Sequence, residues 1–180
     1  IPSAIQNEFF QYDLGYIETQ PILTPSKFPL HYYSNAIIKR SFDILFSLLV
    51  LIFITTWLFP IIALLIKLDS KGSVFFKQKR YGFHDEVFEC LKFRTMIENE
   101  ESTTKTTSQN DSRITKIGRF LRKTSLDEMP QFINVLRGNM SVVGPRPHML
   151  LIDEFYKAKI GRYSVRSLVK PGITGLAQVS

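Results

Sequence analysis

The sequence predicts a small, helix-rich α/β domain with a re-entrant membrane helix near its N-terminal end and a short β-hairpin. Three observations lead to this fold class. An uncharged apolar run covers 44–66, two short segments rich in β-branched and aromatic residues follow at 74–77 and 87–93, and helical periodicity dominates after position 114. With 180 residues, the chain has room for one domain of ordinary size and its anchor.

The chain divides into three parts. Residues 1–36 contain four prolines and no sustained periodicity, so we expect a linker or the remnant of an upstream domain. Residues 37–71 form the anchor. Residues 72–180 form the domain itself, which ends without a closing element and is expected to be C-terminally incomplete.

The apolar run is long enough to cross a bilayer, which takes about 20 residues. Lys and Arg normally mark only the cytoplasmic end of a spanning helix. Here they flank both ends of the run, as Lys39, Arg40, Lys67 and Lys71. Pro60 removes one backbone donor inside the run, so a helix broken near Phe59 and Pro60 would dip into the membrane and return to the same face.

Two other interpretations of the run stay open. A single span with a proline kink would place 1–43 and 67–180 on opposite sides of the membrane, whereas a re-entrant helix leaves both on one side. A buried core helix of a soluble protein fits less well, because the run has no polar face.

Composition narrows the class of ligand. The formal charge of +7 suits a protein that lies on anionic lipid, binds phosphorylated ligands or binds nucleic acid. Cys90 is the single cysteine, so an intramolecular disulfide is excluded. The three histidines are scattered, and metal sites built from Cys and His are therefore not expected.

The segments at 74–77 and 87–93 predict a hairpin, because turn-forming residues separate them at 82–85. The stretch 97–110 is almost entirely polar and cannot bury enough surface to order itself. We expect a mobile surface loop there, with a lid over a site as the alternative.

Three helices are predicted after this loop. At 114–123 the apolar residues share one face and the basic residues another, which predicts an amphipathic helix. Its basic face either is solvated above a core or faces lipid headgroups or phosphate. A second helix through 132–136 should stop at Gly138, a third should cover 150–159, and an irregular stretch should follow from position 170.

The segment 125–131 holds the adjacent carboxylates Asp127 and Glu128 at an expected helix start. Ser125 followed three residues later by Glu128 is the pattern of a capping box, and acids are favoured at a helix N-terminus. The functional alternative is that Asp127 is a nucleophile or metal ligand with Glu128 beside it, as in much phosphoryl chemistry.

Two cationic segments complement these acids. In 144–147, Pro145 and Pro147 hold the backbone on either side of Arg146, whose planar fork suits phosphate oxygens; the alternative is a rigid turn whose arginine points into water. At the end of the second expected strand, Lys92 and Arg94 should share a face. Because two adjacent cations repel, a phosphate or one of the two carboxylates should lie between them.

Together these residues resemble the bacterial sugar transferases, which are monotopic polyprenyl-phosphate phosphoglycosyl transferases. The subgroup that looks most similar is that of the undecaprenyl-phosphate glucose phosphotransferases. The resemblance covers about 37–180 and is carried, in order, by 39–43 (KRSFD), 74–82 (VFFKQKRYG), 92–96 (KFRTM), 110–115 (NDSRIT), 125–131 (SLDEMPQ), 134–136 (NVL), 140–147 (MSVVGPRP) and 170–175 (KPGITG).

The resemblance implies a small catalytic domain that transfers a sugar 1-phosphate from a UDP-sugar to undecaprenyl phosphate at the cytoplasmic face of the bacterial inner membrane. This step begins exopolysaccharide, capsule or O-antigen assembly. By this resemblance Asp127 attacks the sugar-bearing phosphorus, with Glu128 beside it, and both would hold Mg²⁺. The residues it assigns to the donor are Lys92, Arg94, Asp111, Arg113, Gln131, Pro145, Arg146 and Pro147. Lys39 and Arg40 would meet the lipid phosphate.

This chain departs from the family pattern at two positions. Phe59 stands before the anchor proline where relatives commonly have Ser, and Leu176 follows Gly175 where many have Trp. The alternative functions are a non-catalytic membrane-surface module that regulates a partner in glycan assembly and a nucleic-acid binder; the second fits the charge but not the anchor, so we expect no nucleic acid. The partners expected are the two substrates and membrane lipid, and the oligomeric state stays open, a homo-oligomer included.

Overall fold

The computed structural model describes residues 12–17, 20–25, 30, 32–97, 111–161 and 163–176. The chain separates into two compact units, 1–41 and 42–180. In the first unit, strands β1 (Tyr12–Ile17) and β2 (Gln20–Pro25) pair antiparallel, with Ile17 opposite Gln20. The expected linker therefore contains a hairpin. The sequence did not predict this hairpin, because Pro21 and Pro25 argue against strands. Proline is nevertheless tolerated in an edge strand, where an N–H need not be paired.

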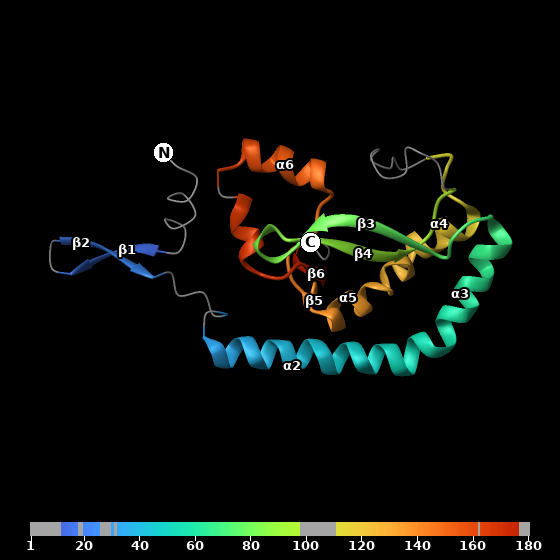
Figure 1. The fold of residues 1–180 in the computed structure, drawn as a ribbon, viewed down its shortest axis with the longest axis horizontal. Coiled ribbons are helices and arrows are strands. Elements are labelled where there is room, and N and C mark those ends of the chain that lie inside the picture. Colours follow the sequence, from blue (N-terminus) through green and yellow to red (C-terminus); the bar gives the residue numbers. More distant parts are fainter. Residues whose placement is uncertain are drawn as a thin grey trace. The chain divides into compact units, whose positions relative to one another are not determined.

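The anchor is one continuous helical segment, Tyr33–Asp69, which is long and apolar enough to cross a membrane by length and composition. It consists of α2 (Tyr33–Val50), a π-helical turn (Leu51–Thr55) and α3 (Thr56–Asp69). Figure 1 shows that α3 runs in a different direction from α2, so the anchor bends. The re-entrant path through the bilayer remains a prediction.

The irregular turn does not lie at Phe59 and Pro60, where the sequence placed the break. Pro60 lies within α3, and the helix widens one turn earlier. Pro60 has no N–H to donate to the carbonyl of Thr56, four residues earlier. Thr55 Oγ1 donates to the carbonyl of Leu51 at 2.6 Å, and Thr56 Oγ1 donates to that of Ile52 at 2.6 Å. These hydroxyls therefore add hydrogen bonds to carbonyls at the bend.

The two strands of the predicted hairpin are confirmed as β3 (Phe75–Tyr81) and β4 (Val87–Phe93), paired antiparallel from Phe75 opposite Phe93 to Tyr81 opposite Val87. The first strand is longer than predicted, because pairing with β4 continues past Lys77. The connection contains a 3₁₀ turn, Phe83–Asp85.

The predicted helices are also confirmed. They are α4 (Lys116–Lys123), α5 (Gln131–Arg137) and α6 (Leu150–Lys159), with 3₁₀ turns at Leu126–Glu128 and Tyr163–Leu168. Thr115 caps α4 by accepting from the N–H of Gly118 at 2.9 Å. Gly138 ends α5 with φ of 89°, a left-handed conformation that glycine adopts without strain.

The prediction of an irregular C-terminal stretch is wrong. Residues Gly172–Thr174 form β6, which pairs parallel with β5 (Ser141–Val143). The pairing joins segments about thirty residues apart through three-residue strands, which carry no local periodicity of their own.

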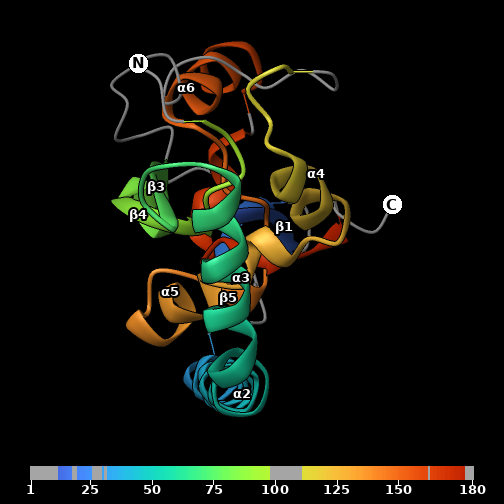
Figure 2. The ribbon, with the colours of Figure 1, turned by 90° about the vertical axis from the view of Figure 1, so that its right-hand side faces the viewer.

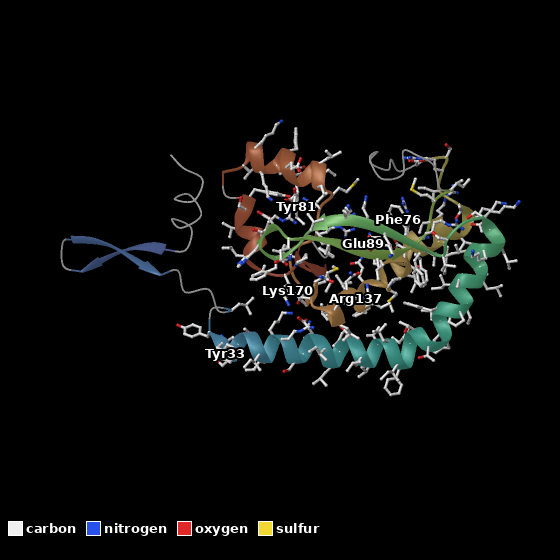
Figure 3. All side chains as sticks on the ribbon, viewed as in Figure 1. Tyr33, Phe76, Tyr81, Glu89, Arg137 and Lys170 are labelled. Carbon is white, nitrogen blue, oxygen red and sulfur yellow. The ribbon has the colours of Figure 1, made fainter. Side chains whose placement is uncertain are left out.

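The anchor forms part of the core of the second unit. One cluster contains Val50 of α2 with residues of β4, α5 and β5, and another contains Ile62 and Ile66 of α3 with Phe93 and Leu121. Figure 2 views α2 nearly end-on, with α5 and β5 beside it. Other apolar side chains of the anchor stand clear of the domain (Figure 3), and Phe53, Trp57 and Leu64 are each at least 59% exposed, so the anchor has an exposed apolar surface.

Candidate active site

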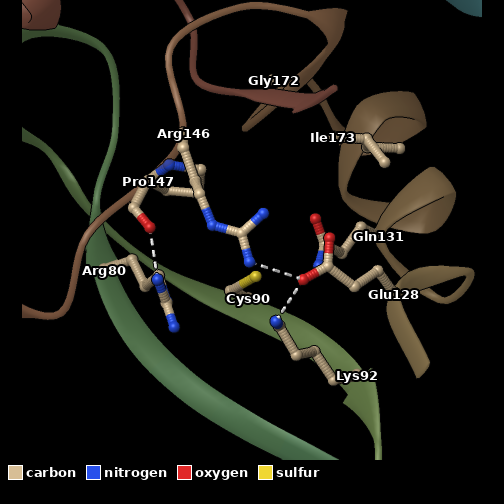
Figure 4. Close-up of a pocket in the computed structure, with 9 residues that line it drawn as sticks. All are labelled: Arg80, Cys90, Lys92, Glu128, Gln131, Arg146, Pro147, Gly172 and Ile173. Atoms are coloured by element: carbon tan, nitrogen blue, oxygen red, sulfur yellow. Dashed lines mark hydrogen bonds and ion pairs between the residues drawn. The ribbon is translucent and has the colours of Figure 1, made fainter. Parts of the chain in front are cut away.

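Three of the sequence-predicted acids and cations, Lys92, Glu128 and Arg146, meet in a small pocket between β4, the segment around Leu126–Glu128, and the loop after β5 (Figure 4), whereas Asp127 is not among its lining residues. Nine residues line it: Arg80, Cys90, Lys92, Glu128, Gln131, Arg146, Pro147, Gly172 and Ile173. The pocket therefore joins segments that lie far apart in the sequence.

Glu128 is the central acceptor of this pocket. Its Oε1 accepts from Lys92 Nζ at 2.6 Å and from Arg146 Nη2 at 3.1 Å. Burial by itself raises the pKa of Glu128, but the charges and hydrogen bonds of Lys92 and Arg146 outweigh it and leave that pKa below its ordinary value. The expectation that a carboxylate lies beside Lys92 is confirmed, and Arg146 points to the same oxygen rather than into water.

Asp127 is buried next to Glu128, in the 3₁₀ turn. Burial raises its pKa, while the positive charge of Lys92 opposes the shift. The capping-box interpretation is wrong, because Ser125 adopts a left-handed conformation with φ of 56° and makes no capping hydrogen bond. The helix begins only at Gln131. The two acids thus lie on a tight turn and do not cap a helix.

The loop that carries Arg146 is fixed by more than its two prolines. Gly144 donates its N–H to the carbonyl of Thr174 at 3.0 Å, and Gly172 donates to that of Pro145 at 3.0 Å. Arg166 donates to the carbonyl of Arg146 and Arg80 donates to that of Pro147. Because backbone and side-chain donors hold the loop from both sides, the Arg146 guanidinium is presented to Glu128 from a fixed backbone.

Arg94 is not brought to this pocket, although it was predicted to share it with Lys92. It is 3% exposed, and its guanidinium donates to the carbonyls of Lys71 and Ser70 at 2.6 and 2.8 Å. Arg94 therefore ties the end of β4 to the segment after α3. The alternation rule failed because the strand ends at Phe93.

Asp111 and Arg113 pair with each other, with Arg113 Nη2 2.6 Å from Asp111 Oδ2. The hydrogen bonds from Arg113 lower the pKa of Asp111 to about 2. Neither residue lines the described pocket. Lys39 and Arg40 lie in α2 within the first unit, so their role at the lipid phosphate stays a prediction.

The sequence analysis did not predict four of the lining residues, Arg80, Cys90, Gly172 and Ile173, or two residues outside the lining, Asn134 and Asp43, that hold neighbouring elements together. Arg80 lines the pocket from β3, and strand alternation, which puts Arg80 on the opposite face from Lys77 and Lys79, could have indicated it. Asn134 is 1% exposed; it accepts from the Leu91 N–H at 3.0 Å and donates to the Glu89 carbonyl at 2.7 Å, so it fixes α5 to β4. Asp43 of α2 accepts from Ser141 Oγ and the Val142 N–H, both at 3.0 Å.

Asp127 and Glu128 are the candidate metal ligands. Among the described residues no group of three or more His, Cys, Asp or Glu side chains could enclose an ion. Two adjacent carboxylates nevertheless fit Mg²⁺, which is usually held by one or two carboxylates together with substrate phosphates and water. The donor set is thus compatible with a magnesium ion that is shared with a phosphorylated ligand.

Comparison with known proteins agrees with this chemistry. The profile of a family described as "Bacterial sugar transferase" matches residues 34–180. A UDP-glucose:undecaprenyl-phosphate glucose-1-phosphate transferase of Escherichia coli (strain K12) is 51% identical over 148 residues, which are 81% of this chain and 32% of that protein. The exopolysaccharide production protein PSS of Rhizobium leguminosarum bv. phaseoli is 45% identical over 150 residues, 81% of this chain and 74% of that protein. An undecaprenyl-phosphate glucose phosphotransferase of Komagataeibacter xylinus is 44% identical over 147 residues, 79% of this chain and 27% of that protein. The chain thus spans about a third of the length of the first of these relatives.

Proposed function

Because this chain belongs to the bacterial sugar transferase family, we propose that it transfers a sugar 1-phosphate from a UDP-sugar to undecaprenyl phosphate. The names of its relatives support both substrates and a place in exopolysaccharide production. The observation that carries the proposal is the pocket in which Lys92 and Arg146 converge on Glu128, the residue next to buried Asp127.

The reaction proceeds in two displacements. A carboxylate oxygen of Asp127 attacks the phosphorus that bears the sugar, the bond from that phosphorus to the bridging oxygen breaks, and UMP leaves with the bonding electrons. An oxygen of undecaprenyl phosphate then attacks the same phosphorus and releases the Asp127 carboxylate. The product is an undecaprenyl diphosphate sugar, and no oxidant or further reactant is needed.

Asp127 and the cations of the pocket supply what these displacements require. Burial of Asp127 makes its carboxylate more basic than usual, which strengthens it as a nucleophile once it is ionised. Lys92 and Arg146, which line the pocket, bind the non-bridging oxygens of the phosphate under attack in this proposal, because charge is spread over these oxygens in the transition state. When bound, Mg²⁺ would be held by Asp127 and Glu128 and would offset the negative charge of the diphosphate.

The membrane anchor explains how a lipid acceptor reaches this site. The bent helix contributes to the core of the catalytic unit and also exposes apolar side chains, so the pocket is held close to lipid. We place the site at the cytoplasmic face of the inner membrane. This is tested by cysteine labelling in intact cells of Leu30→Cys and Lys77→Cys, both at exposed positions. Both should be protected from a reagent that does not cross the membrane. Labelling of one position alone would contradict the re-entrant path, and labelling of both would contradict the cytoplasmic face.

The activity is tested with membranes that contain the full-length protein, incubated with UDP-glucose and undecaprenyl phosphate. We expect UMP release, which Asp127→Asn abolishes, and a phosphosugar trapped on Asp127 when the lipid is left out. UMP release by Asp127→Asn at the wild-type rate would refute the nucleophile. A native protein that never releases UMP with any UDP-sugar would instead favour a non-catalytic role at the membrane surface.

A further inference from the structure

Arg80 is a partly buried cation that lines the pocket. Its guanidinium donates to the carbonyl of Pro147 and, at 2.6 Å, to Oε1 of Gln78, and both acceptors are neutral. Its Nε is buried and has no hydrogen-bond partner among the described residues. Burial lowers the pKa of Arg80 and the charge of Arg146 adds to this effect, while Cys90 and Glu128 oppose it. A charge held in this way costs free energy unless an anion joins it.

The acid of the pocket is already engaged. Lys92 and Arg146 both bind Oε1 of Glu128, so the single negative charge of this carboxylate is already paired with two positive charges, and Arg80 adds a third. Arg80, Lys92 and Arg146 all line the pocket, whereas Glu128 is its one acidic lining residue in the described part of the chain. The excess of positive charge is suited to a ligand with more than one negative charge, such as a diphosphate.

The position of Arg80 indicates which phosphate it meets. In Figure 4 the guanidinium of Arg146 lies between Arg80 and the carboxylate of Glu128. Lys92 and Arg146 both bind Glu128, and the residue before Glu128 in the chain is Asp127, the proposed nucleophile. In an in-line displacement the leaving oxygen lies opposite the attacking oxygen, so the leaving phosphate extends away from the nucleophile.

We propose that Arg80 binds the phosphate of the leaving nucleoside monophosphate, as a second phosphate site beside the one formed by Lys92 and Arg146. This inference rests on the proposed function. It gives Arg80 a catalytic task, because negative charge accumulates on the UMP phosphate as the bond to the sugar-bearing phosphorus breaks, and a guanidinium held there stabilises it. The free Nε–H and the planar fork supply donors for phosphate oxygens.

The test compares the binding of UMP and uridine to the full-length protein in membranes. Arg80→Gln should weaken UMP binding roughly tenfold to hundredfold, the usual cost of a lost charged hydrogen bond, and leave uridine binding unchanged. Lys79→Gln is the matched control, since Lys79 carries the same charge on the same strand but is exposed, and it should bind both ligands as the wild type does.

The alternative role for Arg80 is a strut that only holds the Pro147 carbonyl. In that case UMP and uridine binding would fall together in Arg80→Gln, or neither would fall, and both results overturn the proposal. If Arg80→Gln does not fold, Arg80→Lys is measured in its place and should show a smaller loss confined to UMP; equal UMP affinity would overturn the proposal. A wild type that releases UMP while Arg80→Gln binds it normally refutes this inference alone, whereas a wild type that neither binds nor releases UMP refutes the proposed function as well.

Discussion

Replacing Asn134 by Ala should destabilise the catalytic unit strongly. The side-chain amide of Asn134 accepts from the N–H of Leu91 at 3.0 Å and donates to the carbonyl of Glu89 at 2.7 Å. Asn134 is 1% exposed, so water cannot replace the lost partners without opening the structure. The change leaves one donor and one acceptor of β4 unsatisfied.

The magnitude follows from these two groups. An unsatisfied buried donor or acceptor costs about 1–3 kcal/mol, so the expected loss is about 2–6 kcal/mol in the free energy of unfolding. For a chain of this size that corresponds to a fall in the melting temperature of roughly 5 to 20 °C. The assay is thermal unfolding of the detergent-solubilised protein, followed by circular dichroism.

Asn139→Ala is the control for this prediction. Asn139 lies just beyond the end of α5, is exposed, and makes no side-chain hydrogen bond in the described structure, so its replacement should change stability by no more than about 0.5 kcal/mol. If Asn134→Ala unfolds at the same temperature as Asn139→Ala, the side-chain bridge between α5 and β4 does not hold the hairpin and the reasoning is wrong.

Three further predictions concern the pocket. Burial raises the pKa of Asp127, so the ionised side chain opposes folding at high pH and this cost in stability disappears as pH falls. At pH 7, Asp127→Asn should therefore melt at or above the wild-type temperature while losing activity. A melting temperature below that of the wild type would contradict the burial of an ionised Asp127. The pKa of Glu128 is lowered, so its ion pairs stabilise the fold above the ordinary Glu pKa and this stabilisation is lost as pH falls. Lys92→Met should lower the free energy of unfolding in urea by about 1.5–3 kcal/mol at pH 7 and by less at pH 3. An equal loss at both pH values would exclude the ion pair as the cause. A Cβ on Gly144 would lie 2.4 Å from the Lys170 carbonyl oxygen, so Gly144→Ala should lower both the rate of UMP release and the melting temperature. Gly161→Ala is the control, because a Cβ there meets nothing within 4 Å, and it should change neither quantity.

The corrections to the sequence analysis have a common physical cause. Helix α5, its end at Gly138 and the β3–β4 hairpin follow from local periodicity and turn residues, and all were predicted. The pairing of β5 with β6 and the burial of Arg94 depend on contacts between distant segments, so no local sequence pattern predicted them. The π-helical turn moved the bend away from Pro60, because hydroxyls at Thr55 and Thr56 satisfy carbonyls one turn earlier.

For the site, the sequence alone determined the chemistry: adjacent carboxylates at Asp127 and Glu128, a proline-flanked Arg146 and a strand-borne Lys92 behind an apolar anchor. Residue type and spacing fix these features, because charge, backbone restriction and hydropathy are properties of the chain itself. Only the tertiary structure decided that Lys92 and Arg146 share one oxygen of Glu128 and that Arg80 joins them. Which charges meet depends on how the hairpin, α5 and the paired strands β5 and β6 pack together, and that packing is set by long-range burial.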